Sequence, residues 1–213
     1  MLSRRQFFTA TAATGSATVL GTATAPPALA AGHGRVEDLT HTLSDAFPTY
    51  FGSPGIDMSQ VYNFGEHVFN LFTMNLNEHT GTHIDAPLHF SADGDSVDEI
   101  PVSSLVAPLC VIDIAARAAE DADTRLTPDD IRTWMASHGD IPESACVALY
   151  SGWGAKTGGG GFRNSDDDGV MHFPGFHVEA AIMLIEETGA GSIASDTLSL
   201  DHGPSADFAT HYA

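Results

Sequence analysis

The feature that most constrains the fold of this chain is a pair of apolar runs, PLCVIDI around Cys110 and ACVALY around Cys146. Few polar residues interrupt either run, which predicts strands at residues 109–115 and 146–153 that are covered on both faces. Between the runs, Thr127 is a good N-cap for a helix that has proline at its first position and ends at Gly139. Together these elements predict a mixed α/β fold with more strand than helix.

The remaining elements are predicted from local patterns. A second helix is expected to begin near Pro174 and to stop at Gly189. An aromatic loop, FPTYFGSPG, occupies residues 47–55, and a glycine-rich, acidic loop occupies residues 157–169. Further strands are predicted at residues 36–43, 68–76 and 192–195.

The N-terminus has the features of an export signal. Arg4 and Arg5 precede a run of small and apolar residues, and Ala-Leu-Ala at 28–30 suits a cleavage site. We therefore expect a twin-arginine signal peptide at residues 1–30, one domain at residues 31–213, and a periplasmic or extracellular location. The run lacks the ~20 strongly apolar residues of a membrane span, so no stable membrane association is expected.

Charge and cysteine content narrow the partners. The formal net charge is −20, and it becomes −22 if the signal peptide is removed with its two arginines. Such a chain repels nucleic acid and anionic membranes, which attract basic surfaces. Cys110 and Cys146 are predicted to be small buried core residues, but a disulfide between them after export stays open, because the sequence does not place their Cα atoms.

The stretch NEHTGTHIDAPLHF, residues 77–90, carries the most concentrated chemistry. Its glycine, threonines and proline disfavour a helix and predict a strand end that turns at Gly81. Beyond the turn, alternation points His83 and Asp85 to the same side, and His79 can join them from before it.

Two imidazoles and a carboxylate suit Zn²⁺, Mn²⁺ or Fe²⁺ and leave a position open for water. His89 follows the proline and is placed to act as a general acid or base beside such a water. The alternative is a surface loop whose histidines only form hydrogen bonds, because the HxxxHxD spacing is moderately specific.

The string HTGTHIDAPLH resembles the HxGTHxDxPxH signature of the metal-dependent cyclase-like hydrolases, a family that holds bacterial kynurenine formamidases and isatin hydrolases. DLTHTLSDAFPTYFG resembles the entry strand and substrate loop of that family, and SIASDTLSLDHG resembles its Asp-Thr-x-Ser-x-Asp turn. The resemblance implies a swivelling β/β/α domain and a homo-oligomer, a dimer or tetramer.

Carried to this chain, the resemblance implies that one or two divalent ions, Zn²⁺ or Mn²⁺, are held by His79, His83 and Asp85. It implies a further ligand in His211 and makes His89 the catalytic acid/base. Water activated there would cleave an amide-type C–N bond, in an arylformamide or a cyclic amide, within a small aromatic substrate. The family also has a glutamate ligand beyond the position of Ala213, so the domain is expected to be C-terminally incomplete relative to the family.

Two other functions stay open at this stage. The same site would also suit a lactonase, a dehydratase or a cyclase, and the chain would also suit an exported metal- or ligand-binding protein without turnover. The aromatic residues Phe47, Tyr50 and Phe51 are predicted either to cover a flat substrate or to pack in the core. His172 and His177 are predicted to be loop and surface residues rather than ligands.

Overall fold

The computed structural model describes residues 36–213, and the predicted signal peptide at residues 1–30 lies outside the described residues. All elements named below belong to the unit Glu37–Ala213. Its strands are β1 (Ile56–Tyr62), β2 (Leu71–Leu76), β3 (Leu109–Asp113), β4 (Arg125–Leu126), β5 (Ala145–Tyr150), β6 (Gly175–Phe176) and β7 (Ala190–Ser195). Its α-helices are α2 (Phe64–His67), α3 (Ala115–Glu120), α4 (Pro128–His138), α5 (Val178–Glu187) and α6 (Ala209–Tyr212), and its 3₁₀ turns are η1 (Pro87–His89), η2 (Val102–Leu105) and η3 (Trp153–Lys156).

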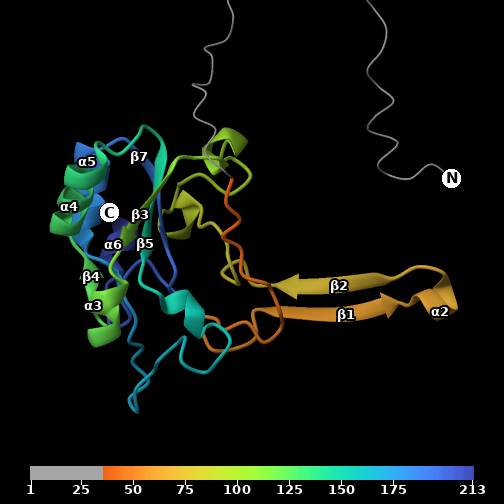
Figure 1. Cartoon of the computed structure of the whole chain (residues 1–213). Helices are drawn as coiled ribbons and strands as arrows, with labels where there is room; N and C mark the ends of the chain where they lie inside the picture. Colours follow the sequence, from red (N-terminus) through yellow and green to blue (C-terminus); the bar gives the residue numbers. More distant parts are fainter. Residues whose placement is uncertain (1–35) are drawn as a thin grey trace, which may run out of the picture. The chain divides into compact units, whose positions relative to one another are not determined.

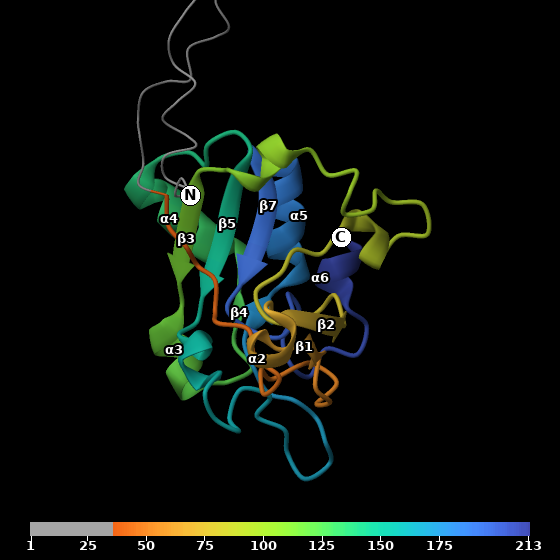
Figure 2. The same cartoon turned by 90° about the vertical axis from the view of Figure 1, so that its right-hand side faces the viewer.

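The centre of the unit is a parallel sheet with strand order β3-β5-β7, seen face-on in Figure 2. Helices α4 and α5 lie together on one face of this sheet (Figure 1). The side chains between the two layers form the main core, which includes Ile112, Ile131, Val147, Leu149 and Leu184. The predicted mixed α/β fold is confirmed.

The expectation that both faces of β3 are covered is wrong. Burial alternates along the strand, with Cys110 and Ile112 buried but Leu109 and Val111 40% and 43% exposed. The reason is that α4 and α5 pack on the same side of the sheet, which leaves the other face of this edge strand to solvent.

The sheet register also decides the cysteine question. Cys110 pairs with Val147, whereas Cys146 pairs with Leu109. Since paired residues share a face and successive residues alternate, the two thiols point to opposite faces and cannot bond without backbone movement. Both cysteines are free; Cys110 is buried as predicted, and Cys146 is half-buried.

Helix α4 follows its sequence pattern closely. Thr127 and Asp130 form a reciprocal capping box, Pro128 occupies the first turn, and Gly139 ends the helix at φ 91°. Helix α5 begins at Val178, later than predicted, because the preceding Gly175 and Phe176 pair with β4.

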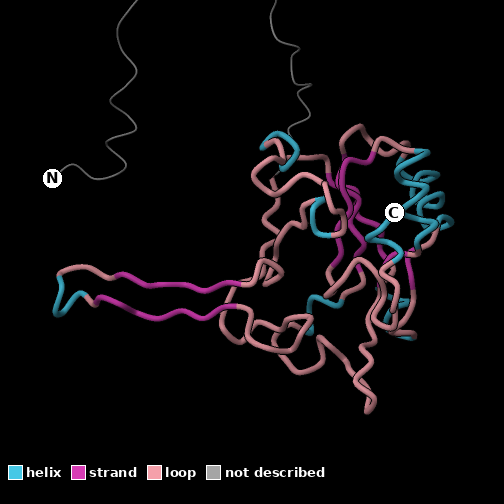
Figure 3. The backbone as a smooth tube through the Cα atoms, turned by 180° about the vertical axis from the view of Figure 1, so that it is seen from behind, coloured by secondary structure: helices cyan, strands magenta, loops and turns pink. Residues whose placement is uncertain are grey.

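Strands β1 and β2 form an antiparallel hairpin, capped by α2, which we call the arm. The arm extends away from the parallel sheet (Figure 3). β2 begins at Leu71 rather than at the predicted residue 68, because Val68 takes a left-handed conformation at the end of α2 (φ 66°). The sequence did not predict β1.

The strand expected at residues 36–43 is wrong. This segment is exposed and belongs to no sheet. The segment is held by a hydrogen bond in which the backbone N–H of His41 donates to Thr82 Oγ1 at 3.0 Å. This side-chain hydrogen bond is made where a strand would pair with its neighbour.

Among the described residues, no helix has the length and apolar character needed to cross a membrane.

The α4 cap provides a stability test. Asp130 bonds the backbone N–H of Thr127 and receives two hydrogen bonds from the Arg117 guanidinium, at 2.8 and 3.0 Å. Asp130→Ala should therefore lower the free energy of unfolding in urea by about 2 kcal/mol. Asp129→Ala removes a neighbouring but exposed acid and should change it by less than about 0.5 kcal/mol.

The difference in unfolding free energy between the Asp130→Ala variant and the parent should depend on pH. Burial, the largest single influence, would raise the pKa of Asp130, but hydrogen bonds from Arg117 and Thr127 outweigh it and lower the pKa. The difference should be complete above the unfolded pKa of about 4 and should vanish as pH falls through the lower folded value. Equal losses for Asp129→Ala and Asp130→Ala would contradict this account.

Candidate metal centre

The site loop is positioned by the base of the arm. After β2 ends, the backbone N–H of Asn77 donates to the Gly55 carbonyl at 2.7 Å and extends the ladder by one residue. The Asn77 side chain then accepts from the backbone N–H of His79 at 2.9 Å. Gly81 follows at φ 71°, a conformation that favours glycine, so the predicted turn is present.

The turn brings two of the predicted ligands, both histidines, onto the carboxylate of the third, Asp85. Asp85 Oδ1 lies 2.8 Å from His79 Nδ1 and 3.3 Å from His83 Nε2. The side chains of His79, His83 and Asp85 are 22%, 31% and 29% exposed, so the group is partly exposed and open to small molecules.

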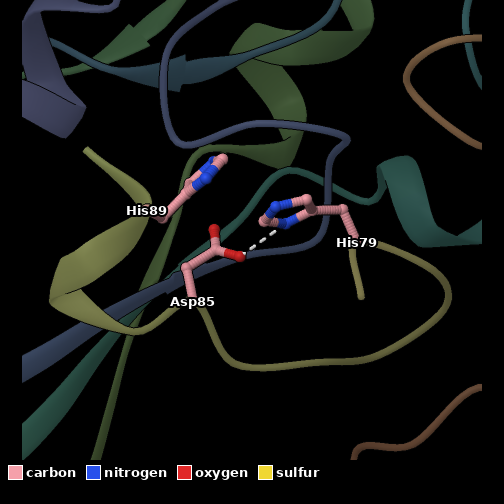
Figure 4. Close-up of side chains that lie close together, drawn as sticks. All are labelled: His79, Asp85 and His89. Carbon is pink, nitrogen blue, oxygen red and sulfur yellow. Dashed lines mark hydrogen bonds and ion pairs between the residues drawn. The ribbon is translucent and has the colours of Figure 1, made fainter. Parts of the chain in front are cut away.

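His89 joins the group from η1. Ligand atoms of His79, Asp85 and His89 all lie within 4.8 Å of one another, and Figure 4 shows both imidazoles beside the carboxylate. The trio that the geometry gathers most tightly is thus His79, Asp85 and His89, whereas the resemblance groups His79, His83 and Asp85. All four residues converge as the sequence predicts, and the division of roles between His83 and His89 stays a prediction.

The orientation of His83 is set by the turn itself. Its Nδ1 donates to the Gly81 carbonyl at 2.7 Å, which leaves Nε2 to face Asp85. An imidazole whose other nitrogen is held by a backbone carbonyl is the usual arrangement of a metal-binding histidine.

The charges of the group act on one another. Burial, the largest single influence, would raise the pKa of Asp85, but the hydrogen bond and charge of His83 and the charges of His79 and His89 lower it to about 2. The hydrogen bond to Asp85 raises the pKa of His83. Burial, followed by the charge of His79, lowers the pKa of His89. Asp85 is therefore ionised at neutral pH, and His89 favours its neutral form.

His211 reaches the site from α6, at the other end of the described chain. Its ring centroid is 6.0 Å from that of His89 and 4.6 Å from that of Phe90. His211 Nδ1 lies 2.6 Å from Asp201 Oδ2, and Asp201 is only 3% exposed. Asp201 was not among the residues predicted to have a role, although it closes the Asp-Thr-x-Ser-x-Asp turn. Its function as the buried partner of His211 became visible only in three dimensions.

An aromatic wall connects the histidines to the loop at residues 47–55. The ring of Phe208 lies 5.5 Å from Phe90 and 6.2 Å from Tyr50. Phe47 packs instead against Phe162 at 6.5 Å, and Phe51 is 68% exposed. Of the three aromatic residues considered from sequence, Tyr50 therefore lies nearest this wall, and contact with a substrate stays a prediction for all three.

The remaining histidines singled out in the sequence have structural partners. His172 Nδ1 lies 2.8 Å from Asp123 Oδ2, and its Nε2 lies 3.4 Å from Asp166. The His177 side chain accepts from the Glu179 backbone N–H and caps α5.

The donor set fits a divalent metal. Imidazole nitrogens and a carboxylate within 4.8 Å of one another are the ligands that Zn²⁺ and Mn²⁺ take in proteins. A cavity of about 600 Å³ at the base of the arm reaches His79 and is otherwise lined by residues 54–57 and 75–78. A small molecule can therefore approach the group from the arm side.

The fold and site together define a mixed α/β protein with a histidine–aspartate centre of the metal-binding type. The model of the Cyclase family, described as "Putative cyclase", matches residues 37–202, and the chain belongs to this family. The chain is 37% identical to an isatin hydrolase from Roseibium aggregatum over 123 residues. This aligned region covers 55% of this chain and 46% of the relative.

Two further comparisons agree. A kynurenine formamidase from Salinibacter ruber is 35% identical over 83 residues, or 38% of this chain and 39% of the relative. The solved structure of isatin hydrolase A from Ralstonia solanacearum superposes with a TM-score of 0.77 at 35% identity, covering 90% of this chain and 82% of that chain. The chain matches less than half the length of these curated relatives.

The buried pair at the end of the chain can be tested alone. Asp201→Ala removes the partner of His211 Nδ1 and of the Thr210 backbone N–H, which donates to Asp201 at 2.9 Å. We expect a loss of about 3 kcal/mol in unfolding free energy, because buried polar groups are left unpaired. Asp207→Ala, at an exposed acid of the same segment, should change it by less than about 0.5 kcal/mol. Similar values for the two variants would count against a buried pair.

Proposed function

We propose that this protein is a metal-dependent hydrolase that cleaves an amide-type C–N bond, in an arylformamide or a cyclic amide, of a small aromatic substrate. The observation that carries the proposal is the convergence of His79, His83 and His89 on the carboxylate of Asp85. Similarity to isatin hydrolases and to a kynurenine formamidase supports the choice of bond.

We assign metal binding to His79, His83 and Asp85, with His211 as a further ligand. A divalent ion, Zn²⁺ or Mn²⁺, supplies the positive charge that polarises a substrate carbonyl and makes water more acidic. Asp85 stays ionised across the neutral range because the neighbouring imidazoles hold its pKa near 2. Asp201 fixes the His211 ring so that its Nε2 is free to face the site.

We assign proton transfer to His89. Its ring centroid lies 4.0 Å from that of His79, so a water within the cluster is within reach of the imidazole. The neutral form accepts a proton from this water and then donates it to the departing nitrogen. The rings of Phe90 and Phe208 form an apolar side to the site, which suits a flat aromatic substrate.

A second reaction is favoured by one specific observation. The family model is named for cyclase activity, and the same residues would serve lactone hydrolysis, dehydration or ring closure. A binding protein without turnover is the remaining alternative. Turnover assays with N-formyl aromatic amines, isatin-like cyclic amides and aromatic lactones distinguish these three cases.

The roles of the site residues can be separated by paired measurements of rate and metal content. His89→Ala should lower kcat by about 10²–10⁴-fold on the preferred amide while metal content is unchanged. His79→Ala and Asp85→Asn should lose bound metal as well as activity. His138→Ala, on α4, is the control and should keep both. Full turnover by His89→Ala would remove this residue from the mechanism.

We also propose that the protein is a homo-oligomer assembled through the arm. The arm exposes many large apolar side chains: Met58, Val61, Tyr62, Phe64, Val68, Phe69, Leu71, Phe72, Met74 and Leu76. At roughly half exposure each, they leave on the order of 1,000 Å² of apolar side chain in water, against the about 800 Å² per partner of a standard interface. A two-stranded hairpin is marginally stable alone, and a second copy of the same arm offers a matching surface.

The arm proposal predicts a change in assembly state. Met74→Asp places a charge on the arm at a side chain that is 68% exposed and should weaken self-association by tenfold or more, measured by sedimentation velocity. Ile185→Asp makes the same change at a 62% exposed position of α5 and should leave assembly intact. A parent protein that is monomeric at micromolar concentration would end this proposal.

Finally, we propose export by the twin-arginine route, supported by Arg4, Arg5 and the run that follows them. Replacing both arginines with lysine should retain the precursor in the cytoplasm, seen by fractionation and immunoblotting in a bacterium with this pathway. Arg35→Lys, beyond the predicted cleavage site, should be exported normally. Export of the double-lysine variant at the normal rate would refute the assignment.

A further inference from the structure

Arg163 is a cation for which the described protein supplies no partner. Three other cations of residues 36–213 are engaged: Arg117 with Asp130, Arg132 with Asp129, and Lys156 over the ring of Trp153. Arg163 has no hydrogen bond or ion pair among the described residues, and its Nε is buried without an acceptor. The terminal nitrogens of this guanidinium keep access to solvent, so they can donate hydrogen bonds to a bound anion.

The guanidinium lies in a cleft of about 490 Å³ between two loops. One wall is formed by residues 45–49 and 52–54, and the other by residues 157–160, 162 and 163. These are the aromatic loop and the glycine-rich loop of the sequence. The proposed hydrolysis assigns no role to the glycine-rich loop.

Gly52 makes room for the arginine. A Cβ at this position would lie 2.5 Å from Arg163 Nη1 and 3.0 Å from its Cζ. The guanidinium therefore packs directly against the backbone of the aromatic loop, at a glycine whose φ of 74° disfavours other residues. The absence of a side chain at Gly52 thus leaves the space that the guanidinium occupies.

The other groups of the cleft indicate the chemistry of its occupant. Phe47, Pro48, Pro54 and Phe162 provide apolar surface, and Phe47 and Phe162 pack edge to face at 6.5 Å. Asp45 also lines the cleft, so a ligand with more than one negative charge is disfavoured. A planar carboxylate matches a guanidinium with two parallel hydrogen bonds, and an attached ring suits the apolar wall.

We propose that the cleft between residues 45–54 and 157–163 binds a small aromatic monocarboxylate, whose oxygens accept hydrogen bonds from the terminal nitrogens of Arg163. In a chain of formal charge −20, anions are repelled in general, so binding depends on this local cation. The residues that line the cleft include none of those to which we assign metal binding or proton transfer, and the inference does not depend on the proposed hydrolysis.

Calorimetric titration of the purified protein with benzoate tests the site, with benzamide as the uncharged isostere. Benzoate should saturate one site, and benzamide should bind at least tenfold more weakly. Arg163→Gln should weaken benzoate by tenfold or more, equivalent to about 1.4 kcal/mol. Arg132→Gln removes the same charge from the exposed side of α4 and should change the affinity by less than twofold.

Two further variants keep the outcome decisive. His79→Ala should bind benzoate as the parent does, whereas loss of binding in this variant but not in Arg163→Gln would place the anion on a metal and overturn the proposal. Arg163→Lys retains the charge and the aliphatic stem but lacks the planar fork, so a folded protein is expected with several-fold weaker binding. Parental affinity in either Arg163 variant, or equal binding of benzamide, would also overturn it.

Discussion

The candidate centre depends on one reversal of the backbone, at Gly81. The residue takes a left-handed conformation, so His79 before the turn and His83 after it both face Asp85. The carbonyl of the same glycine holds His83 Nδ1 and thereby selects the nitrogen that faces the carboxylate. A side chain at this position would favour another backbone conformation and would meet Leu43 at 3.0 Å. The arrangement of the two histidines around Asp85 therefore depends on glycine at position 81.

Large apolar side chains are exposed on particular parts of the unit. The core between the parallel sheet and its two helices is well buried, but the arm and the outer face of β3 present large apolar side chains to solvent. Monomeric soluble proteins rarely leave such areas uncovered. The high net charge disfavours indiscriminate association of copies, so the proposed assembly requires a surface where apolar burial outweighs repulsion.

Elements specified by local interactions could be predicted from the sequence, and elements specified by distant pairing could not. Helix α4 was predicted within a residue, because Thr127, Asp130 and Gly139 act within one or two turns of the chain. Residues 36–43 have a strand-like pattern but no neighbouring strand, and the pattern does not reveal this. β1 was missed because its residues gain their order from pairing with β2 rather than from burial.

The same division applies to the site. The sequence alone specified the donor set at residues 79–89 and its turn, because these residues are close neighbours whose conformation is set by glycine and proline. Only the tertiary structure placed His211 on the buried carboxylate of Asp201, and Arg163 against Gly52. These contacts join segments far apart in the chain, and which of them form depends on how the whole core packs, which no local pattern encodes.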